Sequence, residues 1–150
     1  TPEMAQENGI VIVPMHVSFG GKTYDDGAFP TTEMFDYYKK HRELPRTSGC
    51  TPHDFEATFE RLDRDFPGAP ILYLAYSAST TCSMQSALIA SEGRENFLAI
   101  YTKSVAAGQA AVVLTTARYL REHPEATLDE AGAFVHGLIE KIRMGFTAWG

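Results

Sequence analysis

The sequence predicts an α/β fold, a three-layer α/β/α arrangement with a mainly parallel sheet. Short apolar runs at residues 10–17, 71–75 and 97–101 have the length and content of buried strands. Helical patterns separate these runs, and strands that alternate with helices favour a parallel sheet with helices on both faces. At 150 residues, with 44% hydrophobic and 21% charged residues, the chain has the size and composition of one globular domain.

The first part of the chain predicts a short helix and then a strand. Thr1-Pro2-Glu3 has the form of a helix start, and Gly9 is placed to end that helix. Residues 10–17 give the strongest strand pattern, because their first half is apolar without alternation, as in a strand covered on both faces. Pro14 lacks an N–H group for a ladder, so we expect an edge or a bend in the second half.

A hairpin and a helix are predicted next. Gly20-Gly21 is typical of a tight hairpin turn. Asp25-Asp26-Gly27 indicates a second turn rather than a metal site, because the aspartates lack the spaced oxygen ligands of a calcium loop. Thr31 is the expected N-cap of the following helix, whose buried face is expected to carry Phe35 and Tyr38.

Residues 44–50 are rich in hydroxyls and in breakers of regular structure, and we expect them to form a loop. The next helix begins with a capping box formed by Thr51 and Asp54, with proline at its first position. Phe55 and Phe59 stand one turn apart and mark the buried face of this helix.

The second half of the chain alternates strands and helices. A strand is predicted over residues 71–75, a helix from Ser83, and a third strand over 97–101. Helices are expected over 108–121 and 127–142, the latter beginning with a second capping box.

Two segments rich in hydroxyls precede helices, residues 46–49 and residues 77–83. The second segment leaves the carboxyl end of a predicted strand, where ligands bind in parallel sheets. Free N–H groups at a helix start favour anions, so the hydroxyls of such a segment are suited to a carboxylate or a phosphate. The alternative is that these hydroxyls only cap a helix and bond to their own loop. The residues of the segments leave both interpretations open.

Composition argues against several classes of function. The formal charge of −6 disfavours nucleic acid as a partner and disfavours electrostatic attachment to a membrane. No apolar run is long enough for a membrane span, and no signal-peptide pattern is present. Cys50 and Cys82 do not make a disulfide framework, which points to the cytoplasm.

Motifs for metal and nucleotide chemistry are also missing. The five histidines are scattered and the two cysteines lack metal-ligand spacing, so no metal site is expected. The sequence has neither a Walker lysine motif nor a GxSxG elbow. One enzymatic hypothesis is that Cys82, near a helix start, is a nucleophile with His16 as its base.

Four stretches, in this order along the chain, resemble the N-terminal lobe of the DegV family. The first runs from Val11-Ile12-Val13-Pro14-Met15 to Gly27, and the second from Leu44-Pro45 to Phe55. The third runs from Ser77 through Gln85-Ser86-Ala87, and the fourth covers residues 102–110. The similarity spans essentially the whole chain.

The resemblance implies a bacterial protein of two lobes that binds a long-chain fatty acid at their junction and has no catalytic residue, metal or cofactor of its own. It also implies a partner, since such proteins can serve as the binding subunit of a fatty acid kinase and present the acyl carboxylate to a separate ATP-dependent subunit. The family's carboxylate-binding motifs, "TS" and "LSGT", match Thr47 with Ser48 beside it, and Thr81 followed by Cys82 and Ser83.

This chain departs from the family pattern at both motifs. "TSQPS" reads Thr47-Ser48-Gly49-Cys50-Thr51 here, and "LSGT" reads Thr80-Thr81-Cys82-Ser83. Threonine in place of serine keeps a hydroxyl. Cysteine in place of glycine costs about 1 kcal/mol or more if position 82 needs a positive φ or a close backbone approach.

The resemblance also bears on domain organisation. Residues 1–150 are expected to be the N-terminal lobe without its first strand and without the second lobe. Such a piece is expected to expose apolar surface and to associate into oligomers. Two alternatives to fatty acid binding remain: an enzyme that acts on an acyl or phosphoryl substrate through Cys82 or a loop hydroxyl, and an interaction module that docks a kinase.

Overall fold

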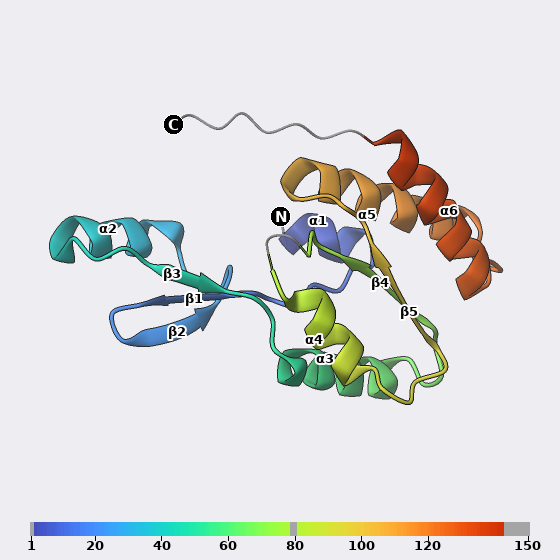
Figure 1. Ribbon diagram of the computed structural model, residues 1–150, viewed down its shortest axis with the longest axis horizontal. Coiled ribbons are helices and arrows are strands. Elements are labelled where there is room, and N and C mark those ends of the chain that lie inside the picture. Colours follow the sequence, from blue (N-terminus) through green and yellow to red (C-terminus); the bar gives the residue numbers. More distant parts are fainter. Residues whose placement is uncertain (1, 79–80, 143–150) are drawn as a thin grey trace.

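The computed structural model describes residues 2–78 and 81–142, and its elements form two parts (Figure 1). In chain order the elements are α1 (Pro2–Glu7), β1 (His16–Phe19), β2 (Lys22–Asp25), α2 (Thr31–His41), β3 (Arg46–Ser48), α3 (Pro52–Asp65), β4 (Ile71–Ala75), α4 (Ser83–Ala90), β5 (Phe97–Tyr101), α5 (Ala106–Glu122) and α6 (Leu128–Lys141). Strands β4 and β5 pair in parallel, whereas β1–β3 form a separate antiparallel sheet in the order β2-β1-β3. We call residues 16–48, which extend to one side, the arm, and the rest the body.

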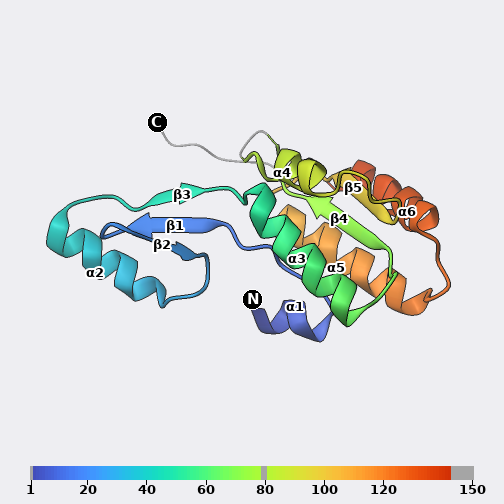
Figure 2. The same ribbon diagram turned by 90° about the horizontal axis from the view of Figure 1, so that it is seen from below.

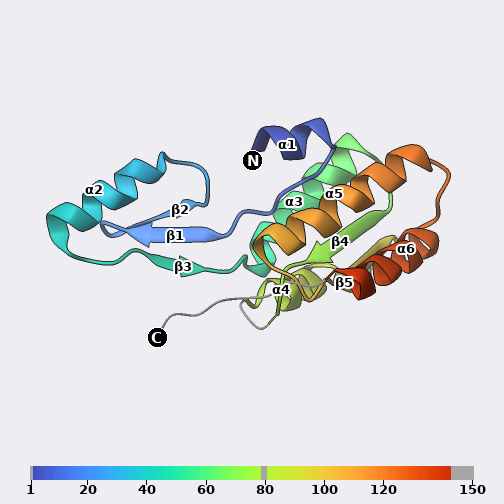
Figure 3. The same cartoon turned by 90° about the horizontal axis from the view of Figure 1, so that it is seen from above.

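The body has three layers, with β4 and β5 between two sets of helices (Figures 2 and 3). On one face, the fully buried Phe55 of α3 meets Tyr73 of β4 edge to face, with ring centroids 5.2 Å apart. On the other face, Val112 of α5 and Val135 of α6 pack around Ile100 of β5. The predicted α/β class is therefore confirmed. The predicted mainly parallel sheet is confirmed for β4 and β5, and the arm adds an antiparallel sheet.

The helix and strand predictions for the body are confirmed closely. Strands β4 and β5 have the predicted bounds and pair in register from Ile71 opposite Phe97. Both capping boxes are present: the hydroxyl of Thr51 accepts a hydrogen bond from Asp54 N, and that of Thr127 accepts one from Glu130 N. Among the described residues, no helix is long and apolar enough to cross a membrane.

The predicted hairpin is also confirmed. Phe19 pairs with Lys22 across a two-residue turn, and Gly20 and Gly21 have φ values of 61° and 72°. A turn of this type needs positive φ at both central positions, which glycine adopts without steric cost.

The prediction of a strand throughout residues 10–17 is wrong. The ladder begins only at His16, and Ile12 is 58% exposed. Pro14 cannot donate to a ladder, and residues 10–15 instead form an extended connection from α1 to the arm. Val13 and Met15 pack against the cluster around Phe55, so only part of the apolar run is used in the core.

Three predictions for the arm are also wrong. Residues 46–48 form strand β3, because they pair antiparallel with the edge of β1 that β2 does not use. Thr31 is the first residue of α2, not its cap, since Pro30 occupies the N-cap without a side-chain hydrogen bond. Phe35 is 54% exposed and Tyr38 is also exposed, whereas Tyr37 packs against Phe19 with ring centroids 5.5 Å apart. Spacing along a helix does not show which of two adjacent aromatic residues faces inward.

Candidate functional site

Thr47 and Ser48 lie on β3, at the end of the arm nearest the body. In the ladder, Thr47 is opposite Val17 and Ser48 is opposite His16. Both side chains are exposed. The strand holds their backbone in place and leaves both residues exposed.

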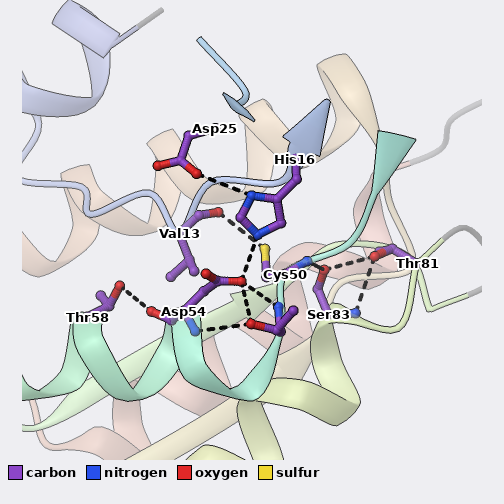
Figure 4. A network of polar contacts seen from close by, with 9 residues as sticks. Val13, His16, Asp25, Cys50, Asp54, Thr58, Thr81 and Ser83 are labelled. Atoms are coloured by element: carbon purple, nitrogen blue, oxygen red, sulfur yellow. Dashed lines mark hydrogen bonds and ion pairs between the residues drawn. The ribbon is translucent and has the colours of Figure 1, made fainter. Parts of the chain in front are cut away.

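Gly49 and Cys50 join this strand to the loop that precedes α4. Cys50 N donates a 3.1 Å hydrogen bond to Ser83 Oγ. Gly49 packs so closely that a Cβ there would lie 3.1 Å from Ser83 Oγ, 3.4 Å from Cys82 Sγ and nearer still to Thr81 Oγ1. The fold therefore brings together the two hydroxyl segments, and it does so through Gly49 and Cys50. Figure 4 shows Cys50 beside Ser83 and Thr81.

Within the second segment, Thr81 and Ser83 support each other. Their hydroxyl oxygens lie 2.8 Å apart, and Ser83 N donates to Thr81 Oγ1 at 3.2 Å. Ser83 is 3% exposed, Thr81 is half-buried and Cys82 is exposed. Thr81 thus accepts a hydrogen bond from the first N–H of α4, and its residue is only partly exposed.

Cys82 does not carry the strain that glycine in the family pattern suggested. Its φ is −84°, in the region that every L residue adopts. The close backbone approach occurs at Gly49 instead, where the family pattern has glutamine. Two of the departures from the family pattern therefore lie close together, a smaller residue at position 49 and a larger one at position 82.

Behind these residues lies a charged group centred on His16. The ring faces two carboxylates: Nε2 lies 2.8 Å from Asp54 Oδ2, and Nδ1 lies 3.2 Å from Asp25 Oδ1. The hydrogen bond to Asp54 raises the pKa of His16, burial opposes this, and the charges of both carboxylates add to the increase. Burial alone would raise the pKa of Asp54, but hydrogen bonds from Thr51 and His16 lower it overall.

The geometry does not favour Cys82 as a nucleophile with His16 as base. Both nitrogens of His16 are occupied by Asp25 and Asp54, so neither is left to accept a proton from a thiol. Burial raises the pKa of the other thiol, Cys50, which keeps it protonated at neutral pH. Among residues 2–78 and 81–142, no group of three or more histidine, cysteine or acidic side chains is arranged to hold a metal ion.

Two features of this site are beyond what sequence patterns predicted. The capping box identified Asp54 as a partner of Thr51, but nothing local shows that the same oxygen also meets His16, 38 residues away. The packing of Gly49 against Thr81 likewise depends on how β3 enters the body. In the sequence, a tight contact was indicated by Gly49, which follows Thr47 and Ser48 and precedes the capping box at Thr51.

Comparison with known proteins places the chain in a family. The model of the family described as "Uncharacterised protein, DegV family" matches residues 1–148. This chain belongs to the DegV family. A DegV domain-containing protein of Caldanaerobacter subterraneus subsp. tengcongensis is 28% identical over 143 residues, covering 94% of this chain and 50% of the relative. The chain thus spans about half the length of this DegV relative.

Solved DegV structures share the fold. The structure described as "Fatty Acid Binding of a DegV family Protein from Thermus thermophilus" has a TM-score of 0.80 at 23% identity and covers 93% of this chain and 49% of that one. The structure of "DegV, a fatty acid binding protein from Bacillus subtilis" has a TM-score of 0.79 at 20% identity, with coverage of 93% and 49%.

Proposed function

We propose that this DegV protein binds a long-chain fatty acid and does not transform it. The carboxylate is held by five residues of the two joined segments, Thr47, Ser48, Thr81, Cys82 and Ser83. The observation that carries the proposal is the hydrogen bond from Cys50 N to Ser83 Oγ, which links the two segments. Hydroxyl and N–H donors beside a helix start are what a carboxylate, which only accepts hydrogen bonds, requires.

The solved relatives support the choice of ligand. The Thermus thermophilus and Bacillus subtilis proteins are both described as binding fatty acids. A protein of Eubacterium ventriosum, with a TM-score of 0.74 at 21% identity over 91% of this chain and 48% of that one, is described as stearic acid-binding.

We extend the proposal to the whole protein. Residues 1–150 are one lobe of a two-lobe protein, and the acyl chain extends from Thr81 to the junction of the lobes. The loaded protein presents the carboxylate to an ATP-dependent fatty acid kinase in the cytoplasm. This extension is supported by the family and by a span of about half the length of its relatives.

Lipid extraction and palmitate binding test the proposal. Mass spectrometry of lipid extracted from the purified protein is expected to find fatty acids. Thr81→Ala and Thr47→Ala are expected to weaken palmitate binding about tenfold to hundredfold, because each removes one hydrogen bond to a charged group. Thr32→Ala, on the exposed surface of α2, is the matched control and keeps wild-type affinity. Absence of fatty acid from repeated preparations, with equal palmitate affinity in all variants, contradicts the proposal.

The same preparations separate binding from thiol chemistry. Cys82→Ser keeps a small polar side chain at the exposed N-cap of α4, so it is expected to bind palmitate as the wild type does. Loss of a measurable turnover in that variant would favour the enzymatic alternative.

A further inference from the structure

His16 contacts one carboxylate of the arm and one of the body, and the second contact joins the two parts. It is the first residue of β1, Asp25 is the last residue of β2 in the arm, and Asp54 lies in the first turn of α3 in the body. The side chain of His16 is 15% exposed, whereas that of Asp25 is 60% exposed. Both ring nitrogens face carboxylate oxygens, and only the protonated ring has a donor on each nitrogen. The protonated ring can therefore donate to both carboxylates, and the neutral ring to only one.

The same residue also fixes both ends of the connection between β3 and α3. At one end, His16 is opposite Ser48 in the antiparallel ladder. At the other end, it donates to Asp54 Oδ2, which also accepts hydrogen bonds from the backbone N–H and the hydroxyl of Thr51, at 2.6 and 2.7 Å. Gly49 and Cys50 lie between these two anchors.

Gly49 and Cys50 are the residues that contact the second hydroxyl segment. Cys50 N donates to Ser83 Oγ, and Ser83 in turn meets Thr81. The positions of these hydroxyls therefore depend on a connection whose two ends are held by His16. Figure 4 shows the polar contacts from Asp25 through His16 and Asp54, with Cys50, Ser83 and Thr81 beside them.

We propose that His16 is a positioning residue for the carboxylate site: its protonated ring aligns Gly49 and Cys50 with Thr81 and Ser83, so that fatty acid binding weakens as His16 loses its proton. This inference rests on the proposed function. Its consequence is a site whose affinity responds to pH through a group that does not touch the ligand.

The direction of the effect follows from the charges around the ring. The titratable groups of this cluster are Asp25 from β2, Asp54 from α3 and the neutral thiol of Cys50. Because the folded-state pKa of His16 is raised above 6.5, its pairing is complete below that pH and is lost as the pH rises through the raised value. The low pKa of Asp54 keeps that carboxylate charged throughout this range.

The test is palmitate affinity measured from about pH 6 to about pH 9. The wild type is expected to bind about tenfold more weakly at the upper end, on the scale of one charge-assisted hydrogen bond. His16→Gln is expected to bind weakly with little dependence on pH. His136→Gln, an exposed histidine on α6, is the matched control and keeps the wild-type profile. Ratios between variants at one pH cancel the titration of palmitate itself.

Asp25→Asn is a second variant that tests the inference even if His16→Gln does not fold. The exposed Asp25 contributes to the raised pKa of His16, so its removal is expected to shift the midpoint of the affinity profile to lower pH. A purely structural role would leave the midpoint unchanged. Palmitate binding with identical profiles in the wild type, His16→Gln and Asp25→Asn overturns this inference and leaves the proposed function standing.

A second readout does not need the ligand. The amide NMR signals of Gly49 and Ser83 are expected to shift with pH together with the His16 ring, and to lose that shift in His16→Gln. If the wild type binds no palmitate at any pH, the proposed function fails, and these signals still decide whether His16 positions the segment. Signals that do not follow His16 overturn the inference.

Discussion

Gly49→Ala is the sharpest single test of how the two hydroxyl segments are joined. The added Cβ would overlap Thr81 Oγ1 and would lie 3.1 Å from Ser83 Oγ. Gly49 has no positive φ, so backbone strain does not contribute and the cost is steric. The side chain of Thr81 has to rotate away, which breaks its 2.8 Å contact with Ser83.

The magnitude follows from three terms. Overpacking a tight contact costs about 1–3 kcal/mol. The broken hydrogen bond costs about 1 kcal/mol more. Replacing glycine reduces the conformational entropy of the unfolded chain, which stabilises the folded protein by about 0.4–1 kcal/mol. We therefore expect the free energy of unfolding of Gly49→Ala to fall by about 1–3.6 kcal/mol, with a clear loss of palmitate affinity because Thr81 moves.

Urea denaturation measures the first effect and palmitate titration the second. Gly137→Ala is the matched control, since a Cβ at that helical position meets nothing within 4 Å. It is expected to gain up to about 1 kcal/mol from helix propensity without a change in affinity. If Gly49→Ala is as stable as the wild type and binds palmitate equally well, the joining of the segments through Gly49 is refuted.

Two further predictions concern the helices. Thr51→Ala and Thr127→Ala each remove a capping box and are expected to lower the free energy of unfolding by about 1 kcal/mol, whereas only Thr51→Ala, beside the hydroxyl segments, weakens palmitate binding. Equal affinity in both variants would show that the cap at Thr51 does not position the site. Gly132→Ala is expected to be about 1 kcal/mol less stable than Gly137→Ala in urea denaturation, because its Cβ would lie 2.8 Å from Leu98 Cδ2 and overpack that contact.

The sequence was most informative where a local pattern coincides with burial. The apolar runs at 71–75 and 97–101 form the central parallel pair because helices cover both of their faces. The capping boxes at Thr51 and Thr127 were predictable because they need only residues three positions apart. Residues 10–13 have an equally apolar pattern but no strand partner among the described residues, and their pattern alone does not reveal this.

The candidate site was predictable in part. The sequence identified two hydroxyl segments before helices, and the fold brings them together. Strand β3 was missed because residues 20–45 separate it from its partner β1 and because it is made of polar residues without a strand pattern. The contact of His16 with Asp54 was missed because it depends on how the arm meets the body, whereas Asp25 lies opposite His16 in the predicted hairpin itself.

The arm has a further consequence for how the protein opens. Its ring contacts join Phe19, Tyr24, Phe29 and Tyr37, which lie close together in the sequence, and α2 has no buried residue. Because these contacts are local and leave α2 without a buried residue, we expect the arm to open as a separate cooperative unit of low local stability. Its amide protons are therefore expected to exchange with deuterium sooner than those of β4 and β5, through an opening that leaves the body folded.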